Sequence, residues 1–416
     1  MKNYKKLQNG SDIRGIAITG VPGELPNLTP DVAEDIARGF VVWLSDRSGK
    51  KPEDLTVAVG RDPRISGKRL VQGMMNGFGP YGVKVYDCGL ASTPAMFMTT
   101  VFPEFACDAG IMVTASHLPY NRNGFKFFTA EGGLNKGDIA QILEYAADEE
   151  ACRAKLGEPG NHDARVRDFG KLVYPMVEGD VMTVYCDHLK NLIVKGADNG
   201  DRPLEGMKIV VDAGNGSGGF YAKRVLKPLG ADVSASQFLE PDGMFLNHAP
   251  NPEDRDAMNS IMTKVISSGA DFGLIFDTDV DRSAAVDGKG REIARNGIVA
   301  MAAALVAEEH PGTTVVTDSG RTSSAIAPSA ATTAAPTDDD RRPGHDRGGT
   351  GTGAARHAGR GPAAVLGVVL HREQDLEQRG AGDVPGHVQG LDQLLEREFL
   401  VGERVETRLP GAVEQH

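Results

Sequence analysis

The sequence has few cysteines and no long apolar run. Its four cysteines are spread over 416 residues without a C-x-x-C pair, which argues against a zinc site or a disulfide framework and favours reduced thiols in a core. They are Cys88, Cys107, Cys152 and Cys186. No apolar stretch approaches the roughly 18 residues of a membrane span, and the start leads into polar NGSD rather than an apolar signal segment. These absences predict a globular protein of the cytoplasm.

An excess of positive charge is also absent, because the formal net charge is −12. This balance argues against a nucleic acid or an anionic membrane as the main partner, whereas a local basic cluster can still hold a small anionic substrate. With 40% hydrophobic and 25% charged residues, the chain has the composition of a soluble protein with two to four domains. Nothing in these patterns indicates an oligomeric state.

The last quarter of the chain lacks two residue classes. No lysine follows Lys289, and no aromatic residue occurs between Phe276 and Phe399. From Gly320 onward Ala, Thr, Gly, Pro and Arg dominate, with too few large apolar residues to form a core. We expect residues 320–416 to be a low-complexity, disordered segment. The sharp boundary suggests an altered reading frame or a truncation.

Strand and helix patterns alternate in the first 150 residues. Apolar runs at 55–59, 83–86 and 109–113 predict strands, and helical spacing after Thr29–Pro30 and after Ser66 predicts helices that begin there. This alternation predicts an α/β domain with a mixed or largely parallel sheet, whose functional loops follow the carboxyl ends of strands.

A second α/β unit follows a polar stretch at 148–168 that has the composition of a linker or a surface helix. Its expected strands are 207–211 and 272–276, with a helix at 221–229. A helix at 297–309 and a strand at 314–317 would begin a third unit. We therefore predict domains at 1–165 and 170–295 and the start of another at 296–319.

Residues 114–126, reading TASHLPYNRNGFK, are the first candidate site. They place Ser116 between two apolar segments, in a stretch whose Pro119, Asn121, Asn123 and Gly124 favour turns. We expect a shaped loop that directs a hydroxyl group. Upstream, NGSDIRG at 9–15 puts Arg14 in a glycine-bracketed turn, and Arg61 follows the strand at 55–59.

The second candidate site, DTDVDR at 277–282, directly follows an apolar strand. Three carboxylates at alternating positions need a cation, and oxygen ligands of this kind suit Mg²⁺. An EF-hand would need Gly at loop position six and Glu at twelve, where Arg282 and Gly288 stand. A phosphatase-type D-x-D-x-T/V motif would need Thr or Val at Asp281.

T-A-S-H with a following proline, N-G-x-K and D-x-D-x-D-R together resemble the signatures of the α-D-phosphohexomutases, the phosphoglucomutase/phosphomannomutase family. G-S-D-I-R-G, D-A-G-N-G-x-G at 212–218 and N-H-x-P-N-P at 247–252 extend the resemblance over residues 9–319. Leu118 stands where Asn is usual, and Thr278 and Val280 replace glycines of the metal loop, which makes that loop less adaptable. The sugar-contacting and phosphate-binding loops of the family's later domains have no counterpart after Gly320.

The resemblance implies roles for individual residues. Ser116 would carry the phosphoryl group, and its phosphate oxygen would join Asp277, Asp279 and Asp281 around Mg²⁺. Lys126 would be the general acid/base, assisted by His117 and Arg14. Arg282, Arg61 and Asn123 would bind substrate or phosphate, although Arg61 could equally pair with Asp62 or Asp87.

The implied activity is that of an isomerase, an intramolecular phosphotransferase that interconverts the 1- and 6-phosphates of glucose, mannose or both. A hexose 1,6-bisphosphate would be its intermediate and activator, and a small sugar phosphate its partner. The alternative is a non-catalytic remnant that binds a sugar phosphate or Mg²⁺. Gly214, Gly216 and Gly219 also fit a dinucleotide pattern, but this pattern has many false positives, and His248 is only a weak candidate.

Overall fold

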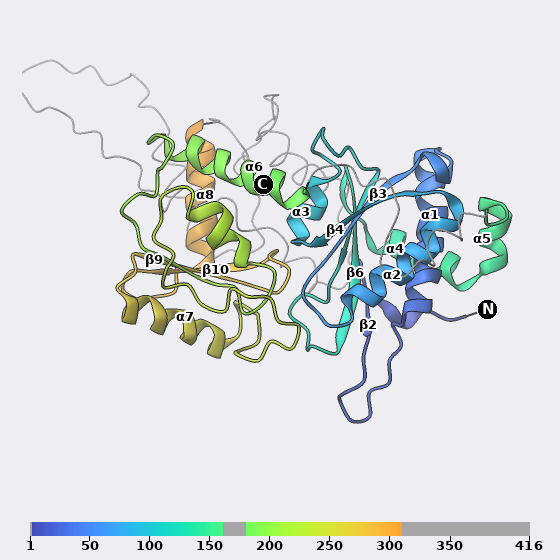
Figure 1. Ribbon diagram of the computed structural model, residues 1–416, viewed down its shortest axis with the longest axis horizontal. Helices are drawn as coiled ribbons and strands as arrows, with labels where there is room; N and C mark the ends of the chain where they lie inside the picture. Colours follow the sequence, from blue (N-terminus) through green and yellow to red (C-terminus); the bar gives the residue numbers. More distant parts are fainter. Residues whose placement is uncertain (1, 161–179, 310–416) are drawn as a thin grey trace, which may run out of the picture.

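The computed structural model describes residues 2–160 and 180–309, which form two α/β units (Figure 1). The first unit contains β1 (Gln8–Asn9), β2 (Asp12–Ile16), α1 (Pro30–Ser48), β3 (Thr56–Arg61), α2 (Gly67–Phe78), β4 (Lys84–Leu90), α3 (Thr93–Met98), β5 (Ala109–Val113), β6 (Arg122–Thr129), β7 (Gly132–Gly133), α4 (Lys136–Ala147) and α5 (Glu149–Leu156). The second contains α6 (Val181–Ala197), β8 (Ile209–Asp212), the π-helix η5 (Tyr221–Leu226), α7 (Arg255–Ser268), β9 (Phe272–Phe276) and β10 (Ser283–Asp287), and α8 (Arg295–Glu309) follows it. The predicted strand at 314–317 and the segment 320–416 lie outside the described residues.

The first sheet is mixed, as predicted. Its strand order is β1-β2-β6-β5-β3-β4, with β7 paired to β6. Strand β3 runs parallel to β4 and β5, whereas β6 runs antiparallel to β2 and β5. The carboxyl ends of β3 and β5 therefore lie side by side, and the residues that follow them meet at one edge of the sheet.

Two of our local predictions on this sheet were wrong. Strand β6 begins at Arg122, so Asn123, Gly124 and Lys126 belong to a strand, and the serine loop is only residues 114–121. Arg14 lies within β2, opposite Gly124, and not in a turn. In both cases the ladder bonds to neighbouring strands outweigh the local turn preference of Asn and Gly. Gly124 is needed there, because a Cβ would lie 2.2 Å from the Ile13 carbonyl oxygen.

The helix starts were predicted with mixed success. Thr29 caps α1 as expected, since its Oγ1 accepts a hydrogen bond from the Val32 N–H at 3.4 Å, and Pro30 occupies the first turn. Ser66 precedes α2 but its side chain makes no capping bond. Its hydroxyl accepts instead from the Asn123 amide at 2.9 Å, so Ser66 ties the helix start to β6.

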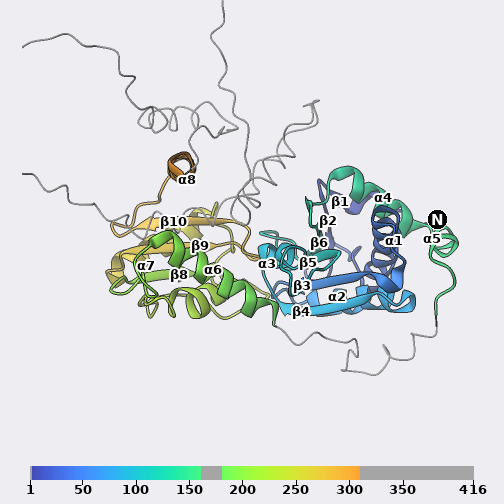
Figure 2. The same ribbon diagram turned by 90° about the horizontal axis from the view of Figure 1, so that it is seen from above.

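Alternate residues of the central strands belong to two different cores. On one face, α1, α2 and α4 pack over residues such as Ile111, and on the other face Met112 packs with α3. The second core continues into the other unit, where it includes Leu189 of α6 and Leu274 of β9. Figure 2 shows α3 at this junction. Because one core spans both sheets, the loops at the junction are held at fixed relative positions.

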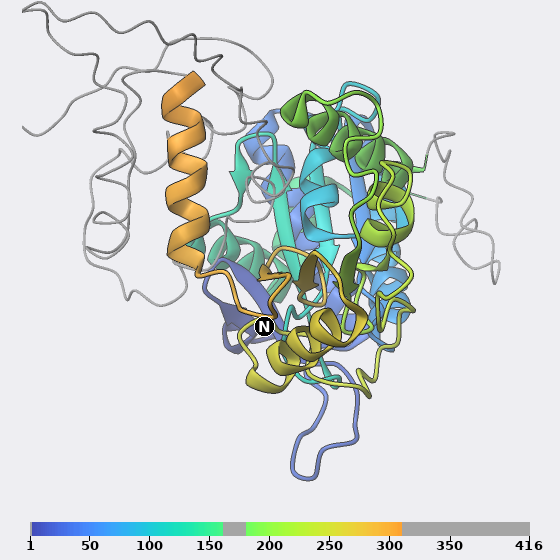
Figure 3. The same cartoon turned by 90° about the vertical axis from the view of Figure 1, so that its left-hand side faces the viewer.

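The second sheet has the order β10-β9-β8, with β8 parallel to β9 and β10 antiparallel to β9. Its other face packs against α7. The helix predicted at 221–229 is a π-helix that ends at Leu226, two residues before Pro228, which has no N–H to continue it. Helix α8 stands beside the two units (Figure 3). Among the described residues no helix is both long and apolar enough to cross a membrane.

Candidate active site

Ser116 lies in the serine loop after β5, at the junction of the two units. Its residue is 2% exposed and its φ is +51°, a left-handed conformation that a non-glycine residue adopts only when its surroundings hold it there. The Ser116 hydroxyl donates to Asp277 Oδ2 at 3.0 Å and accepts from Arg282 Nη2 at 2.6 Å. The serine loop and the loop after β9 therefore meet at this hydroxyl.

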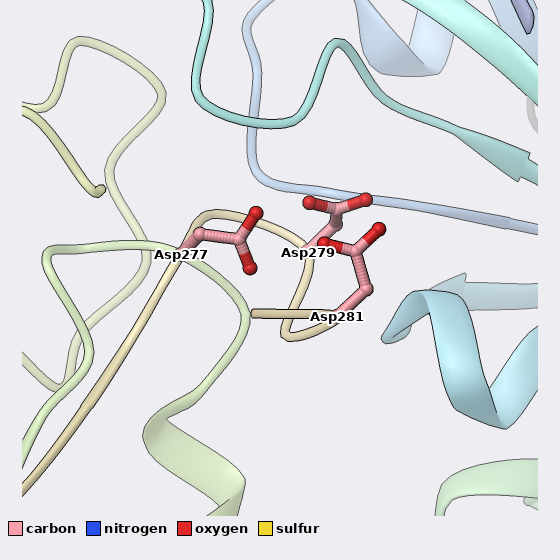
Figure 4. A group of neighbouring side chains, drawn as sticks. All are labelled: Asp277, Asp279 and Asp281. Carbon is pink, nitrogen blue, oxygen red and sulfur yellow. The ribbon is translucent and has the colours of Figure 1, made fainter. Parts of the chain in front are cut away.

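The acidic loop, residues 277–282, connects β9 to β10 and carries the acidic triad of Asp277, Asp279 and Asp281. One carboxylate oxygen from each lies within 4.8 Å of the others, and Figure 4 shows all of these side chains on the one loop. Burial, followed by the charges of Asp281 and Asp279, raises the pKa of Asp277 well above its ordinary value. Val280 in this loop has φ +66°, a conformation that strains a β-branched residue. That the loop is less adaptable than it would be with glycine stays a prediction.

Two cations partly balance the triad. Lys126 of β6 forms an ion pair with Asp281, and its Nζ lies 3.7 Å from Asp279 Oδ2. Arg282 Nε lies 3.3 Å from Asp277 Oδ2 and 3.8 Å from Asp281 Oδ1. Burial by itself would raise the pKa of Asp281, but the neighbouring Lys126 and Arg282 outweigh it and lower that pKa.

The acidic triad fits a hard divalent cation. Oδ1 of Asp279 and Oδ1 of Asp281 are buried and have no hydrogen-bond partner among the described residues. Buried carboxylate oxygens without donors are costly unless a cation completes them. Oxygen-only ligands from carboxylates, with room for a phosphate oxygen, are the set that Mg²⁺ prefers. Asp277, Asp279 and Asp281 are thus the residues that would hold it.

His117 and Arg14, the other residues expected to assist the chemistry, each contact a charged neighbour. Nη2 of Arg282 is bonded to Nδ1 of His117 and also to the Ser116 hydroxyl, so the guanidinium connects His117 with the serine. Arg14 donates to Asp12 at 2.8 Å, and its side chain is 8% exposed. Its strand, β2, pairs with β6, where Arg14 lies opposite Gly124, two residues before Lys126.

The two remaining predicted binders have structural partners. Asn123 is fully buried, and its side chain donates to Ser66 and accepts from the Gly124 N–H. Arg61 is the last residue of β3 and donates to the Asp62 carbonyl at 3.2 Å. The Asp62 carboxylate is paired by Arg64 instead. Substrate binding by Asn123 and Arg61 stays a prediction.

The glycine-rich turn after β8 has a packing role. Ser217 N–H donates to the Thr278 carbonyl at 2.8 Å, and a Cβ on Gly216 would lie 2.7 Å from that same oxygen. The turn therefore supports the acidic loop from behind. A Cβ on Gly214 would lie 2.9 Å from Pro250 Cβ, and one on Gly219 would lie 2.1 Å from the Leu239 carbonyl oxygen. Close packing therefore accounts for these glycines without a dinucleotide.

Two residues that support the site were not predicted. Thr93, at the start of α3, donates through its hydroxyl to Asp279 Oδ2 at 2.6 Å and through its N–H to the Asp279 carbonyl at 2.8 Å. Arg64 is 1% exposed and reaches the backbone of the serine loop. No local pattern marks either residue, because their partners lie 186 and 52 residues away in sequence.

His248 lies apart from the acidic triad and contacts Asp212, the last residue of β8. Its Nε2 lies 3.0 Å from Asp212 Oδ1, and its Nδ1 lies 2.8 Å from the Ala249 carbonyl. Burial would lower the pKa of His248, but the hydrogen bond and charge of Asp212 outweigh it and raise that pKa.

The four cysteines are free thiols, as expected, and burial raises the pKa of Cys107 to about 12.

Comparison with known proteins supports the resemblance to the phosphoglucomutase/phosphomannomutase family. Residues 5–153 match the model of phosphoglucomutase/phosphomannomutase α/β/α domain I, and residues 183–290 match that of domain II. The phosphoglucomutase/phosphomannomutase of Thermococcus kodakarensis is 32% identical over 301 residues, covering 72% of this chain and 60% of its own. The phosphoglucosamine mutase of Alkaliphilus oremlandii is 33% identical over 298 residues, covering 71% of this chain and 59% of its own.

A solved structure is similar as well. The crystal structure of a phosphoglucomutase/phosphomannomutase family protein from Burkholderia thailandensis superimposes with a TM-score of 0.57 at 26% identity, covering 75% of this chain and 61% of that one. Fold and site together define an α/β protein with a serine, a carboxylate triad and two cations at a domain junction. The chain belongs to the phosphoglucomutase/phosphomannomutase family. It spans about 60% of the length of the curated relatives it matches.

Proposed function

We propose that this chain is a phosphohexomutase that interconverts hexose 1-phosphate and hexose 6-phosphate through a phosphoserine at Ser116 and a hexose 1,6-bisphosphate intermediate. The observation that supports it is the convergence of the Ser116 hydroxyl, the acidic triad, Lys126 and Arg282 where the two units meet. Glucose and mannose phosphates are the expected substrates. The name of the Alkaliphilus relative adds glucosamine phosphate to those worth testing.

The need for a metal follows from the charge at the site. The triad contributes three carboxylates against the two cations Lys126 and Arg282. Phosphorylation of Ser116 would add about −1.5 to −2 charge. Mg²⁺ held by the triad and a phosphoserine oxygen would withdraw charge from the phosphoryl group. Hexose 1,6-bisphosphate would act as the activator that loads Ser116.

Residues of this chain would transfer the proton of the sugar hydroxyl and stabilise the charge that develops on Ser116 Oγ. A sugar hydroxyl oxygen would form the new bond to phosphorus as the bond between phosphorus and Ser116 Oγ breaks. Lys126, in its neutral form, would take the proton of the sugar hydroxyl and, as an ammonium, would pass it to the Ser116 Oγ that the phosphoryl group leaves. Arg282, which already donates to Oγ, would stabilise the charge that develops there. His117 would orient that guanidinium, and Arg14, on the neighbouring strand β2, would assist.

The direct test is a mutase assay with glucose 1-phosphate, catalytic glucose 1,6-bisphosphate and Mg²⁺. Ser116→Ala should reduce activity to background, because it removes the hydroxyl that would carry the phosphoryl group. Ser267→Ala, at an exposed serine on α7, is the matched control and should keep the wild-type rate. Equal rates in wild type and Ser116→Ala would exclude the proposed nucleophile. Mannose and glucosamine phosphates in parallel would identify the preferred sugar.

A second function is favoured by one observation, the coverage of only about 60% of the curated relatives. A remnant with domains I and II would bind a sugar phosphate or Mg²⁺ without turnover. Mass spectrometry separates the two functions: phosphoserine at Ser116 in a protein without mutase activity would indicate the remnant. A small sugar phosphate as partner and a cytoplasmic location belong to the same proposal.

A further inference from the structure

Arg64 is the most deeply buried cation near the site, and its guanidinium ends on backbone carbonyls. Its Nη2 donates to the carbonyls of Ser116 and Leu118, and its Nη1 donates to those of Pro119 and Arg122 at 2.6 and 3.2 Å. These four carbonyls span the serine loop and the first residue of β6. One planar guanidinium therefore holds both ends of the loop that presents the nucleophile.

A second set of hydrogen bonds links Arg64 to Ser116 through Asp62 and Thr114. Arg64 Nε donates to Asp62 Oδ2 at 3.0 Å, and the Thr114 hydroxyl donates to the same oxygen at 2.7 Å. Thr114 Oγ1 in turn accepts from the Ser116 N–H at 2.9 Å. Both backbone groups of Ser116, its carbonyl and its N–H, are thus linked to the Asp62 carboxylate. This closed network accounts for the left-handed φ of +51° at Ser116.

The second unit closes over this network. The Arg64 guanidinium carbon lies 5.2 Å from the centre of the Phe245 ring. A Cβ on Gly243 would lie 2.5 Å from the Pro63 carbonyl and 2.9 Å from the Arg64 Cα, so the backbones are in close contact. The loop before His248 therefore covers Arg64 from the side of the second unit.

We propose that Arg64 is a positioning residue that, with Asp62 and Thr114, clamps the serine loop so that Ser116 Oγ stays aimed at the acidic triad. Its catalytic consequence rests on the proposed function. A lysine cannot replace it, because an ammonium has three N–H donors at one point and cannot bond four carbonyls and the Asp62 carboxylate at once. Arg64, Asp62 and Thr114 all belong to the first unit, and Phe245 of the second unit covers the Arg64 guanidinium.

The clamp itself is tested by hydrogen exchange on the full chain. Arg64→Lys keeps the charge beside Asp62 and should still fold, whereas Arg64→Met leaves a buried carboxylate unpaired. The amides of Leu118 and Arg122, bonded within the loop, should exchange about 10-fold faster in Arg64→Lys. Peptides from α1 should not change. Thr114→Val removes the second arm without a change of charge and should have a similar effect. Arg69→Met, at an exposed arginine on α2, is the control.

The catalytic consequence is tested by the half-reaction. Glucose 1,6-bisphosphate with Mg²⁺ should phosphorylate Ser116 about 100-fold more slowly in Arg64→Lys, with an unchanged half-saturating concentration. Unchanged loop exchange in Arg64→Lys and Thr114→Val would overturn the clamp. Faster exchange with an unchanged phosphorylation rate would overturn the positioning role. If the wild type itself is not phosphorylated, the proposed function fails, and the exchange result still decides the clamp.

Discussion

The serine loop and the acidic loop are built on the same plan. Each follows a fully buried strand, β5 or β9, and each contains a non-glycine residue with positive φ, Ser116 at +51° and Val280 at +66°. They differ in how their polar groups are satisfied. The serine loop is tied down by Arg64, Thr114 and Asp62 and retains one buried side-chain oxygen without a partner among the described residues, Asn121 Oδ1. The acidic loop retains three such oxygens, on Thr278, Asp279 and Asp281.

This difference indicates that the two loops have different roles, one in presenting the serine and the other in holding a metal ion. The protein's own hydrogen bonds hold the loop that would present the nucleophile. The acidic loop is supported by Thr93 and by the glycine-rich turn, and its carboxylates are the ones that could hold a metal ion. We therefore expect changes in the two loops to have different signatures, in rate for one and in metal affinity for the other.

After the loss expected for Ser116→Ala, the largest effect should come from Lys126, which follows the serine loop on β6 and forms an ion pair with Asp281 of the acidic loop. Lys126→Arg keeps a positive charge there, but a guanidinium does not lose its proton near neutral pH. Steady-state assays should show kcat reduced about 10²–10⁴-fold, with little change in thermal stability. Lys136→Arg, at an exposed lysine on α4, serves as control. A kcat near that of the wild type would remove Lys126 as the general acid/base.

Metal affinity should fall next. Changes to residues that merely orient metal ligands already weaken binding about 10–100-fold, so Asp279→Asn should weaken Mg²⁺ binding at least that much. Titration calorimetry, or the rise of Tm with Mg²⁺, measures it. Asp187→Asn, at an exposed residue paired with Lys190 on α6, should bind as the wild type does. Equal Mg²⁺ affinity in both variants would show that the ion binds elsewhere.

The strain at Val280 predicts a smaller effect on stability. Val280→Ala and Val280→Gly both remove the side chain, but only glycine adopts φ +66° without penalty. Val280→Gly should therefore be more stable than Val280→Ala by about 1–2 kcal/mol in urea unfolding. At an ordinary strand position the order reverses, with glycine about 0.5–1 kcal/mol less stable. Val286 in β10 provides that comparison, and the same order at both positions would argue against strain.

The smallest effect concerns pH. The pKa of His248 is raised above its ordinary value by Asp212, against the effect of burial. A raised folded-state pKa adds stability that is fully present below about pH 6.5, the unfolded value, and is lost as pH rises through the folded value. The contribution should be under about 1 kcal/mol, because the cost of burying the charged ring opposes the gain from Asp212. His248→Gln should remove this part of the pH dependence of unfolding, and an unchanged profile would exclude His248 as its source.

Much of this could be read from local pattern. The apolar runs at 109–113 and 272–276 coincide with β5 and β9, and Thr29–Pro30 begins α1. Each pattern depends on a few neighbouring residues, so no tertiary information is needed. The predictions failed where distant pairing decides the backbone. Asn123, Gly124 and Lys126 have turn-like or polar character, yet β2 and β5 on either side draw them into β6.

The sequence by itself determined which groups are present: a serine among turn residues, three alternating aspartates and the basic residues near them. Only the tertiary structure decided that these groups meet, because Ser116 and Asp277 are 161 residues apart and are brought together by a core shared between two sheets. It also decided which arginine is indispensable to the serine loop. Arg61 and Arg64 look alike in sequence, but burial among four carbonyls selects Arg64, and only folding creates that environment.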